Sequence, residues 1–256
     1  MAQHARIGPS SAPRWMHCPA SVRMSDPNTS PHPELLPKSG GRAATIGTIL
    51  HDAFEQSMIL GEVVFLADHA IGIRSVGGDS KESLALLRSA FSAAQKLISD
   101  FDLVNVKLEV RLHPGARVGS KDLWGTCDLL AVSRDTTHLV IADLKMGKHA
   151  VSPDSPQLLV YATGARVLHP NVKKITTAII QPTVSVTYSS KTFSSQEMDG
   201  FENKLRDVVV AIEDHNTQPT PTFKACQWCP ASSFCPSRSN GGESFKALDV
   251  SGVEFA

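Results

Sequence analysis

Two apolar runs separated by a short polar turn form the feature that most constrains the fold of this sequence. Residues 129–132 (LLAV) and 139–142 (LVIA) are uniformly apolar, and residues 134–137 (RDTT) lie between them. Strands as uniformly apolar as these are normally covered on both faces. Residues 124–145 therefore predict two strands joined by a tight turn, within a sheet that is buried on both sides.

Charged residues stand at one end of this predicted hairpin. Asp128 opens the first strand, while Asp143 and Lys145 close the second and share a face because they are two residues apart. Two carboxylates and an ammonium group should then converge at the end of a buried sheet, which costs desolvation energy unless a divalent cation is held there. Hard oxygen ligands favour Mg²⁺ or Mn²⁺ over zinc. The alternative is an ordinary ion pair between Asp143 and Lys145.

Two further segments offer candidate ligands for such a cation. Residues 43–60 form an amphipathic pattern in which Gly47, His51 and Glu55 lie one turn apart on a single stripe. Neutral imidazole binds metals well, although a lone helical histidine is more often structural. Residues 105–112 alternate as a strand, with Val106, Leu108, Val110 and Leu112 toward the core. Glu109 points the other way, toward either the acidic group or solvent.

The remaining patterns complete an alternation of helices and strands. Residues 81–102 predict a helix built on Leu84, Leu87, Phe91, Ala94, Ile98 and Phe101. A helix is expected at 154–169, a buried strand at 174–181, an edge strand at 184–190 and a long helix at 195–215. Gln157 and Tyr161 share one face of the 154–169 helix. This order predicts an α/β fold, with a mixed central sheet flanked by helices.

Four cysteines have the spacing of a ligand set. Cys226, Cys229 and Cys235 are arranged as C-x2-C-x5-C, and Cys18, also followed by proline, is the candidate fourth ligand. From this spacing alone, an iron–sulfur cluster and a zinc ion are equally compatible. Cys127 neighbours Asp128 on the predicted strand and should point away from it into the packing. Such a site would join the two ends of the chain.

Composition limits the classes of partner. The chain has 256 residues and 25 basic against 25 acidic side chains, so no global positive field would recruit nucleic acid. DNA contact would have to come from a local groove. No stretch is apolar enough to span a membrane, and the first residues lack the apolar segment of a secretory signal. We therefore expect a cytoplasmic protein whose cysteines are ligands or thiols rather than disulfides.

Taken together, these motifs resemble the RecB-like branch of the PD-(D/E)XK nuclease superfamily. That family has a G-x-x-x-H-x-x-x-E helix, a strand glutamate, a G-x-x-D strand, a D-x-K strand and a Q-x-x-x-Y helix. The matching residues are Gly47, His51 and Glu55; Glu109; Gly125 and Asp128; Asp143 and Lys145; and Gln157 and Tyr161. One upstream and three downstream cysteines are similar to the iron–sulfur members, such as CRISPR-associated exonucleases and the AddB nuclease domain. The RW-x-x-C-P-A-S opening looks like a phage or prophage branch.

The resemblance implies a restriction-endonuclease-like core and Mg²⁺- or Mn²⁺-dependent hydrolysis of DNA, by exonuclease action in recombination, repair or phage genome processing. His51, Asp128, Asp143 and the Leu144 carbonyl would hold the metal, with Glu55 and Glu109 as further candidates. Lys145 would activate water, and Gln157 and Tyr161 would orient Lys145 or contact the phosphate backbone. Cys18, Cys226, Cys229 and Cys235 would hold a [4Fe–4S] cluster, with zinc as the lesser alternative.

The resemblance also implies an organisation and a set of partners. Residues 1–42 would supply a cluster cysteine, 43–216 the nuclease core, 217–240 the cysteine-rich segment and 241–256 a loose tail. DNA is the expected partner, in a bacterial or phage-infected cytoplasm. A recombinase, single-strand-binding or helicase chain, or an oligomer, would add processivity. The alternative function is a non-catalytic DNA-binding or assembly subunit that keeps the nuclease fold as a scaffold.

Overall fold

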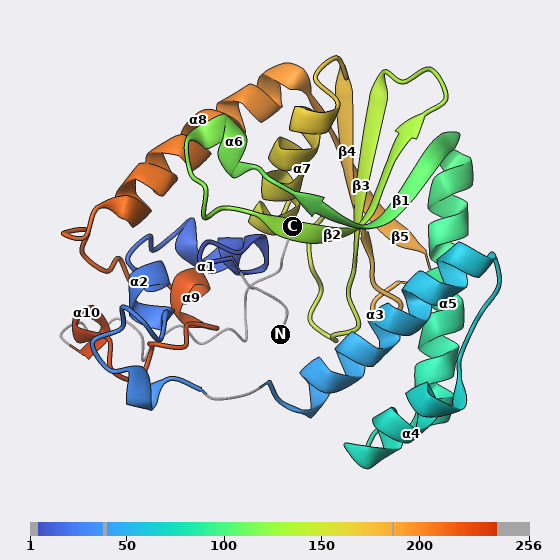
Figure 1. Ribbon diagram of the computed structural model, residues 1–256, viewed down its shortest axis with the longest axis horizontal. Coiled ribbons are helices and arrows are strands. Elements are labelled where there is room, and N and C mark those ends of the chain that lie inside the picture. Colours follow the sequence, from blue (N-terminus) through green and yellow to red (C-terminus); the bar gives the residue numbers. More distant parts are fainter. Residues whose placement is uncertain (1–4, 38–39, 186, 240–256) are drawn as a thin grey trace, which may run out of the picture.

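A five-stranded mixed sheet forms the centre of the computed structural model, which describes residues 5–37, 40–185 and 187–239 (Figure 1). The strands lie in the order β1 (Leu103–Leu112), β2 (Gly125–Ser133), β3 (His138–Leu144), β4 (Lys174–Ile180) and β5 (Tyr188–Ser194). The β3–β4 pair is parallel, and the other three neighbouring pairs are antiparallel. The predicted α/β fold with a mixed sheet is therefore confirmed.

Helices cover both faces of this sheet. One face packs against α3 (Arg42–Leu60) and α5 (Ser80–Asp100), and the other against α7 (Pro156–Leu168) and the start of α8 (Ser195–Glu213) (Figure 1). The short helix α4 (Ala67–Ser75) packs on α3 and α5. The short elements are η1 (Pro9–Ser11), α1 (Ala12–Trp15), α2 (Ser21–Ser25), η2 (Pro33–Leu35), α6 (Gly115–Val118), α9 (Phe223–Cys226) and α10 (Pro236–Ser239). No helix in the described ranges is long and apolar enough to cross a membrane.

The central hairpin forms as the apolar runs predict. Leu129 and Val140 pack on the α5 side, and Leu130 and Ile141 pack on the α7 side, all almost fully buried. Burying a leucine or isoleucine side chain stabilises a fold by about 1.5–3 kcal/mol. In the turn, the Asp135 carboxylate accepts hydrogen bonds from the Thr137 backbone and hydroxyl. Two covered faces and a satisfied turn account for the position of β2 and β3.

The predicted alternation of buried and exposed residues along β1 is confirmed, but its apolar side chains do not share one face. Val106 and Leu108 pack on the α5 side, whereas Val110 and Leu112 pack on the α7 side. The facing changes because Asn105 and Glu109 adopt positive φ angles of 52° and 46°. The register with β2 also shifts between Val104 and Lys107, as in a β-bulge. Bulges re-aim side chains, and the second interruption lies at a candidate ligand.

Two other boundaries differ from the sequence predictions. The edge strand spans Tyr188–Ser194 rather than 184–190, because the backbone amides of Val184 and Ser185 both donate to the Gln181 carbonyl and form a turn. The helix predicted at 81–102 ends at Asp100. Its fully buried stripe runs through Leu87, Ala90, Ala94 and Leu97, while Leu84 and Phe91 are only half-buried. Alanines against the sheet allow close packing, which the larger side chains would prevent.

The N-terminal segment packs directly on the helices of the core. Ile7, Trp15 and Val22 form one apolar cluster with α7 and α8, and the Trp15 indole N–H donates to the Gly8 carbonyl at 3.0 Å. Trp15 is fully buried. The RW-containing opening is therefore an anchor that holds Cys18 in place. The predicted tail, residues 241–256, lies outside the described residues.

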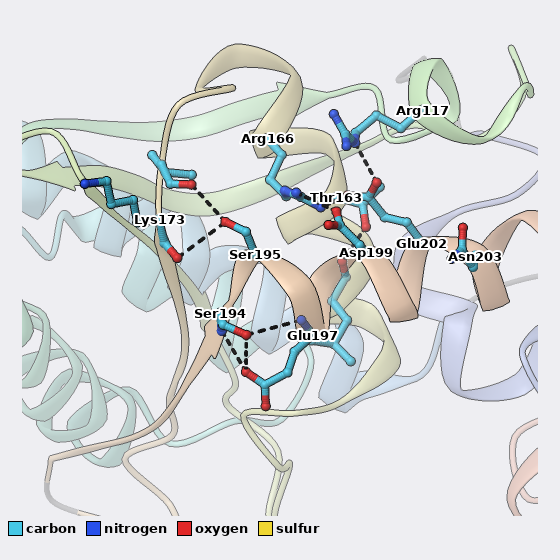
Figure 2. Close-up of polar contacts among 12 residues, drawn as sticks. Arg117, Thr163, Arg166, Lys173, Ser194, Ser195, Glu197, Asp199, Glu202 and Asn203 are labelled. Carbon is cyan, nitrogen blue, oxygen red and sulfur yellow. Dashed lines mark hydrogen bonds and ion pairs between the residues drawn. The ribbon is translucent and has the colours of Figure 1, made fainter.

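A buried glutamate connects three helices (Figure 2). Glu202 of α8 is 4% exposed and binds the guanidinium groups of Arg117, at 2.7 Å, and Arg166 of α7, at 2.5 Å. Arg166 also lies 2.8 Å from Asp199. Both oxygens of Glu202 are thus paired, and this network fixes α6, α7 and α8 relative to one another.

Candidate functional site

The candidate site lies where β2 begins and β3 ends. The register of the hairpin pairs Leu129 with Ala142, so Asp128 and Asp143 lie opposite each other one step further along. The Leu144 backbone N–H donates to Asp128 Oδ2 at 2.6 Å, which fixes that carboxylate. Its other oxygen, Oδ1, is 3.6 Å from His51 Nδ1 on α3. The predicted meeting of Asp128 with the end of β3 is confirmed.

Three potential metal ligands come together from three elements. His51 (α3), Glu109 (β1) and Asp128 (β2) each place one ligand atom here, and these three atoms lie within 4.8 Å of one another. Glu109 has a positive φ of 46°, a left-handed conformation that is unfavourable for a residue with a Cβ atom. This strain occurs at the point where β1 changes its facing, and it brings the carboxylate to the histidine. Such strained residues cluster at functional sites.

Asp143 lies outside that group of three but is held beside it. The carboxylate is 3% exposed; its Oδ1 accepts from Gln157 Nε2 at 2.8 Å, and its Oδ2 lies 2.8 Å from Lys145 Nζ. This ion-pair contact does not have hydrogen-bond geometry, so Oδ2 remains a buried atom without a hydrogen bond. Lys145 Nζ donates instead to Gln157 Oε1 at 3.1 Å. Gln157 therefore bridges the lysine and the aspartate.

The close carboxylates perturb one another's protonation. Burial, together with the negative charge of Asp128, raises the pKa of Asp143 to about 6 despite the opposing charge of Lys145. Partial desolvation and the charges of Asp128 and Glu55 raise the pKa of Glu109 to about 7. Burial alone would lower the pKa of His51, but the Asp128 carboxylate raises it above its ordinary value. The site thus concentrates negative charge that one lysine does not neutralise.

This donor set fits a hard divalent cation. Carboxylate oxygens and one imidazole nitrogen suit Mg²⁺ or Mn²⁺. The raised pKa values of Asp143 and Glu109 show the excess of negative charge that a cation would relieve, even with Asp143 Oδ2 ion-paired to Lys145. The ion pair between Asp143 and Lys145 is present, so the simpler alternative is part of the arrangement. Alone, it does not explain the convergence of His51, Glu109 and Asp128.

The other predicted site residues take supporting positions. Tyr161 is 5% exposed and packs against Gly125, where an added Cβ would lie 2.7 Å from Pro9 Cδ and 3.2 Å from Tyr161 Cε1. Its burial is suited to orienting neighbours rather than to touching a phosphate backbone. Glu55 is close enough to raise the pKa of Glu109. A Cβ at Gly47 would meet nothing within 4 Å, so open space lies one turn before His51.

The four predicted cysteine ligands line one small cavity between the N-terminal segment around Cys18 and residues 219–235. Cys18, Cys226, Cys229 and Cys235 all border it, together with Pro219 and Pro221 and neighbouring small residues. The Thr220 N–H donates to Cys18 Sγ at 3.4 Å, and Ser25 Oγ is 4.0 Å from Cys229 Sγ. Cys127 is fully buried in the α7-side cluster, away from this cavity, as predicted.

Sequence reasoning missed Gln181, which organises the loop after Lys145. Gln181 is 4% exposed; its Nε2 donates to the carbonyls of Gly147 and His149 at 2.7 and 2.8 Å, and its Oε1 accepts from the Val151 N–H at 3.0 Å. Three hydrogen bonds from one buried side chain fix this loop beside the carboxylates. The only signal in the sequence is a glutamine directly after the apolar strand KITTAII.

Comparisons with known proteins give one family and a distant structural likeness. The protein described as "Crystal structure of SSO0001" is similar with a TM-score of 0.39 and 14% identity, over 92% of this chain and 88% of that chain. A likeness at that level supports no argument about fold or activity. The family model described as "Protein of unknown function (DUF2800)" matches residues 4–254, so the chain belongs to this family.

Proposed function

We propose that this protein is a metal-dependent DNA nuclease, acting as an exonuclease with the restriction-endonuclease-like core implied by its motifs. The observation that carries the proposal is the convergence of His51, Glu109 and Asp128, with the buried Asp143 carboxylate, whose pKa is raised, beside them. Ligands from three separate elements, one of them on strained backbone, are costly to assemble for packing alone. Their chemistry matches the needs of phosphodiester hydrolysis.

His51, Glu109, Asp128 and Asp143 would hold Mg²⁺ or Mn²⁺ in this arrangement. When bound, the cation supplies a water of lowered pKa and neutralises charge on the phosphate oxygens. Lys145, anchored by Gln157 at 3.1 Å, is placed to orient the attacking water and to stabilise negative charge in the transition state. Gln157 positions Asp143 and Lys145 at once, through its amide nitrogen and oxygen respectively. The role of the Leu144 carbonyl stays a prediction.

Hydrolysis of end-labelled DNA in Mn²⁺ tests this proposal. We expect the wild-type protein to release labelled nucleotides, and we expect Asp143→Ala and Lys145→Ala to lose cleavage with an unchanged circular-dichroism spectrum. Full activity in either variant would remove that residue's role. A wild-type protein that binds DNA but does not cut it would instead support the scaffold function. Circular DNA that remains intact while linear DNA is degraded would support exonuclease action.

We also propose that the four cysteines hold an iron–sulfur cluster. All four cysteines border one cavity whose other lining residues include Met24, Pro219 and Pro221. This apolar, proline-rich setting suits an iron–sulfur cluster shielded from oxygen. Protein purified without oxygen should be brown and absorb near ~400 nm; a colourless protein containing one zinc per chain would contradict the cluster.

A further inference from the structure

An exposed tryptophan lies beside the loop that follows Lys145. Trp228 belongs to the cysteine-rich segment, between Cys226 and Cys229, and is 70% exposed. Its ring centroid is 6.1 Å from that of His149, with the planes inclined at 58°. Trp and Tyr are enriched at binding interfaces, so this exposed indole beside a second ring is a candidate contact for a ligand.

The loop that carries His149 is fixed with respect to the candidate site. His149 follows Lys145 by four residues, and the buried Gln181 side chain holds the loop through the carbonyls of Gly147 and His149. Thr183 Oγ1 also donates to the Gly147 carbonyl, at 2.5 Å. Lys145 in turn contacts Asp143 and Gln157. The Trp228–His149 pair is therefore attached, through a short constrained loop, to the proposed catalytic lysine.

The two segments that meet here are cationic within a neutral chain. Residues 144–153 and 215–239 contain no aspartate or glutamate, and they carry Lys145, Lys148, Lys224 and Arg238. The whole chain has a formal net charge of zero. An exposed aromatic ring carried by segments rich in cationic residues has the chemistry that binds single-stranded nucleic acid, in which bases stack on rings while cations contact phosphates.

We propose that Trp228, with His149, forms a stacking site for a nucleobase of single-stranded DNA next to the scissile phosphodiester. This proposal rests on the nuclease function and specifies the form of its substrate at that site. A base within a duplex is stacked on both faces and is not available to the indole, whereas a frayed or single-stranded end is. The cysteine-rich segment would then serve substrate binding by presenting Trp228 beside the loop.

Binding of a labelled single-stranded oligonucleotide, measured by fluorescence anisotropy with Ca²⁺ replacing Mn²⁺, tests the stacking site without relying on cleavage. Trp228→Ala should weaken binding roughly 5- to 150-fold, the range expected for one stacked base, and Trp228→Phe should retain most of the affinity. Phe223→Ala is the matched control, because Phe223 is also an exposed aromatic of this segment, at 55%. It should bind as the wild type does.

An oligonucleotide with abasic sites separates stacking from charge. The wild type should bind it more weakly than the intact strand, while Trp228→Ala should bind both equally. Equal affinities of wild type and Trp228→Ala for the intact strand would overturn the proposal, as would a loss of affinity that is just as large on the abasic strand. If the wild type cleaves DNA but Trp228→Ala binds DNA as tightly as the wild type, only the stacking site is refuted. If binding depends on Trp228 but the wild type does not cleave DNA, only the nuclease function is refuted.

Discussion

Glu202 and Asp143 are both buried carboxylates, but their surroundings differ. Glu202 is 4% exposed, and two arginines from other elements pair with its oxygens. Asp143 is 3% exposed, and its two oxygens contact one glutamine and one lysine. A buried carboxylate paired with two arginines ties helices together. Asp143 has a single cation beside several carboxylates and a raised pKa, which indicates a binding site.

Activity should separate the two carboxylates most sharply. Asp143→Asn keeps the shape of the side chain but removes its charge, so Mn²⁺-dependent cleavage should fall by at least about 100-fold. Glu202 lies away from the proposed chemistry, so Glu202→Gln should keep the wild-type activity per folded molecule. Initial rates on end-labelled DNA, normalised to the folded fraction, measure both. Equal losses in the two variants would mean that the comparison does not distinguish function from structure.

Stability should separate them in the opposite direction. Glu202→Gln leaves two guanidinium groups without their carboxylate, so the unfolding free energy should fall by about 3 kcal/mol. This value is at the low end of the cost of breaking a buried ion pair, because Arg166 keeps its second partner, Asp199. Arg134→Gln, which breaks the exposed pair with Asp102, is the control and should change the unfolding free energy much less, because water screens that pair. Chemical denaturation measures all three proteins. Comparable values for Glu202→Gln and Arg134→Gln would refute the structural role of the network.

Gln157 offers a further test of this comparison, because its side-chain amide contacts both Asp143 and Lys145. Gln157→Ala removes the bridge between Asp143 Oδ1 and Lys145 Nζ while leaving every proposed ligand in place. Groups that orient ligands typically contribute 10- to 100-fold, so cleavage and Mn²⁺ affinity should fall by about that factor. Titration of the initial rate with Mn²⁺ separates the two effects. Unchanged activity would show that Asp143 and Lys145 keep their positions without the bridge.

The pH dependence of stability offers the smallest test. Burial and like charges raise the pKa of Asp143 to about 6 and that of Glu109 to about 7, above the unfolded values near 4. A carboxyl group whose pKa is raised in the folded state contributes to folding stability. That contribution is fully present below pH ~4 and is lost as the pH rises through about 6 to 7. Without metal, Glu109→Gln should therefore gain melting temperature over the wild type near neutrality but not near pH 4. Parallel pH profiles for both proteins would contradict the repulsion.

The hairpin and its acids could be predicted from sequence because they rest on local periodicity. Apolar runs fixed β2 and β3, and alternation placed Asp128 opposite the end of β3. Glu109 was expected only as one of two equal alternatives, since a positive φ at a glutamate has no signature in the sequence. The same backbone feature divided β1 between the two faces. Gln181 could not be predicted, because its partners lie 30 to 34 residues away along the chain.

The metal site itself is tested most directly by crystals soaked in Mn²⁺ and measured for anomalous scattering. We predict an anomalous peak bounded by His51, Glu109 and Asp128, on the side of the Asp143 carboxylate, that is absent in crystals of Asp128→Asn. A Mn²⁺ concentration that saturates cleavage should also fill this position. No peak at that position, in crystals whose protein cuts DNA with Mn²⁺, would contradict the assignment of these side chains as the metal centre.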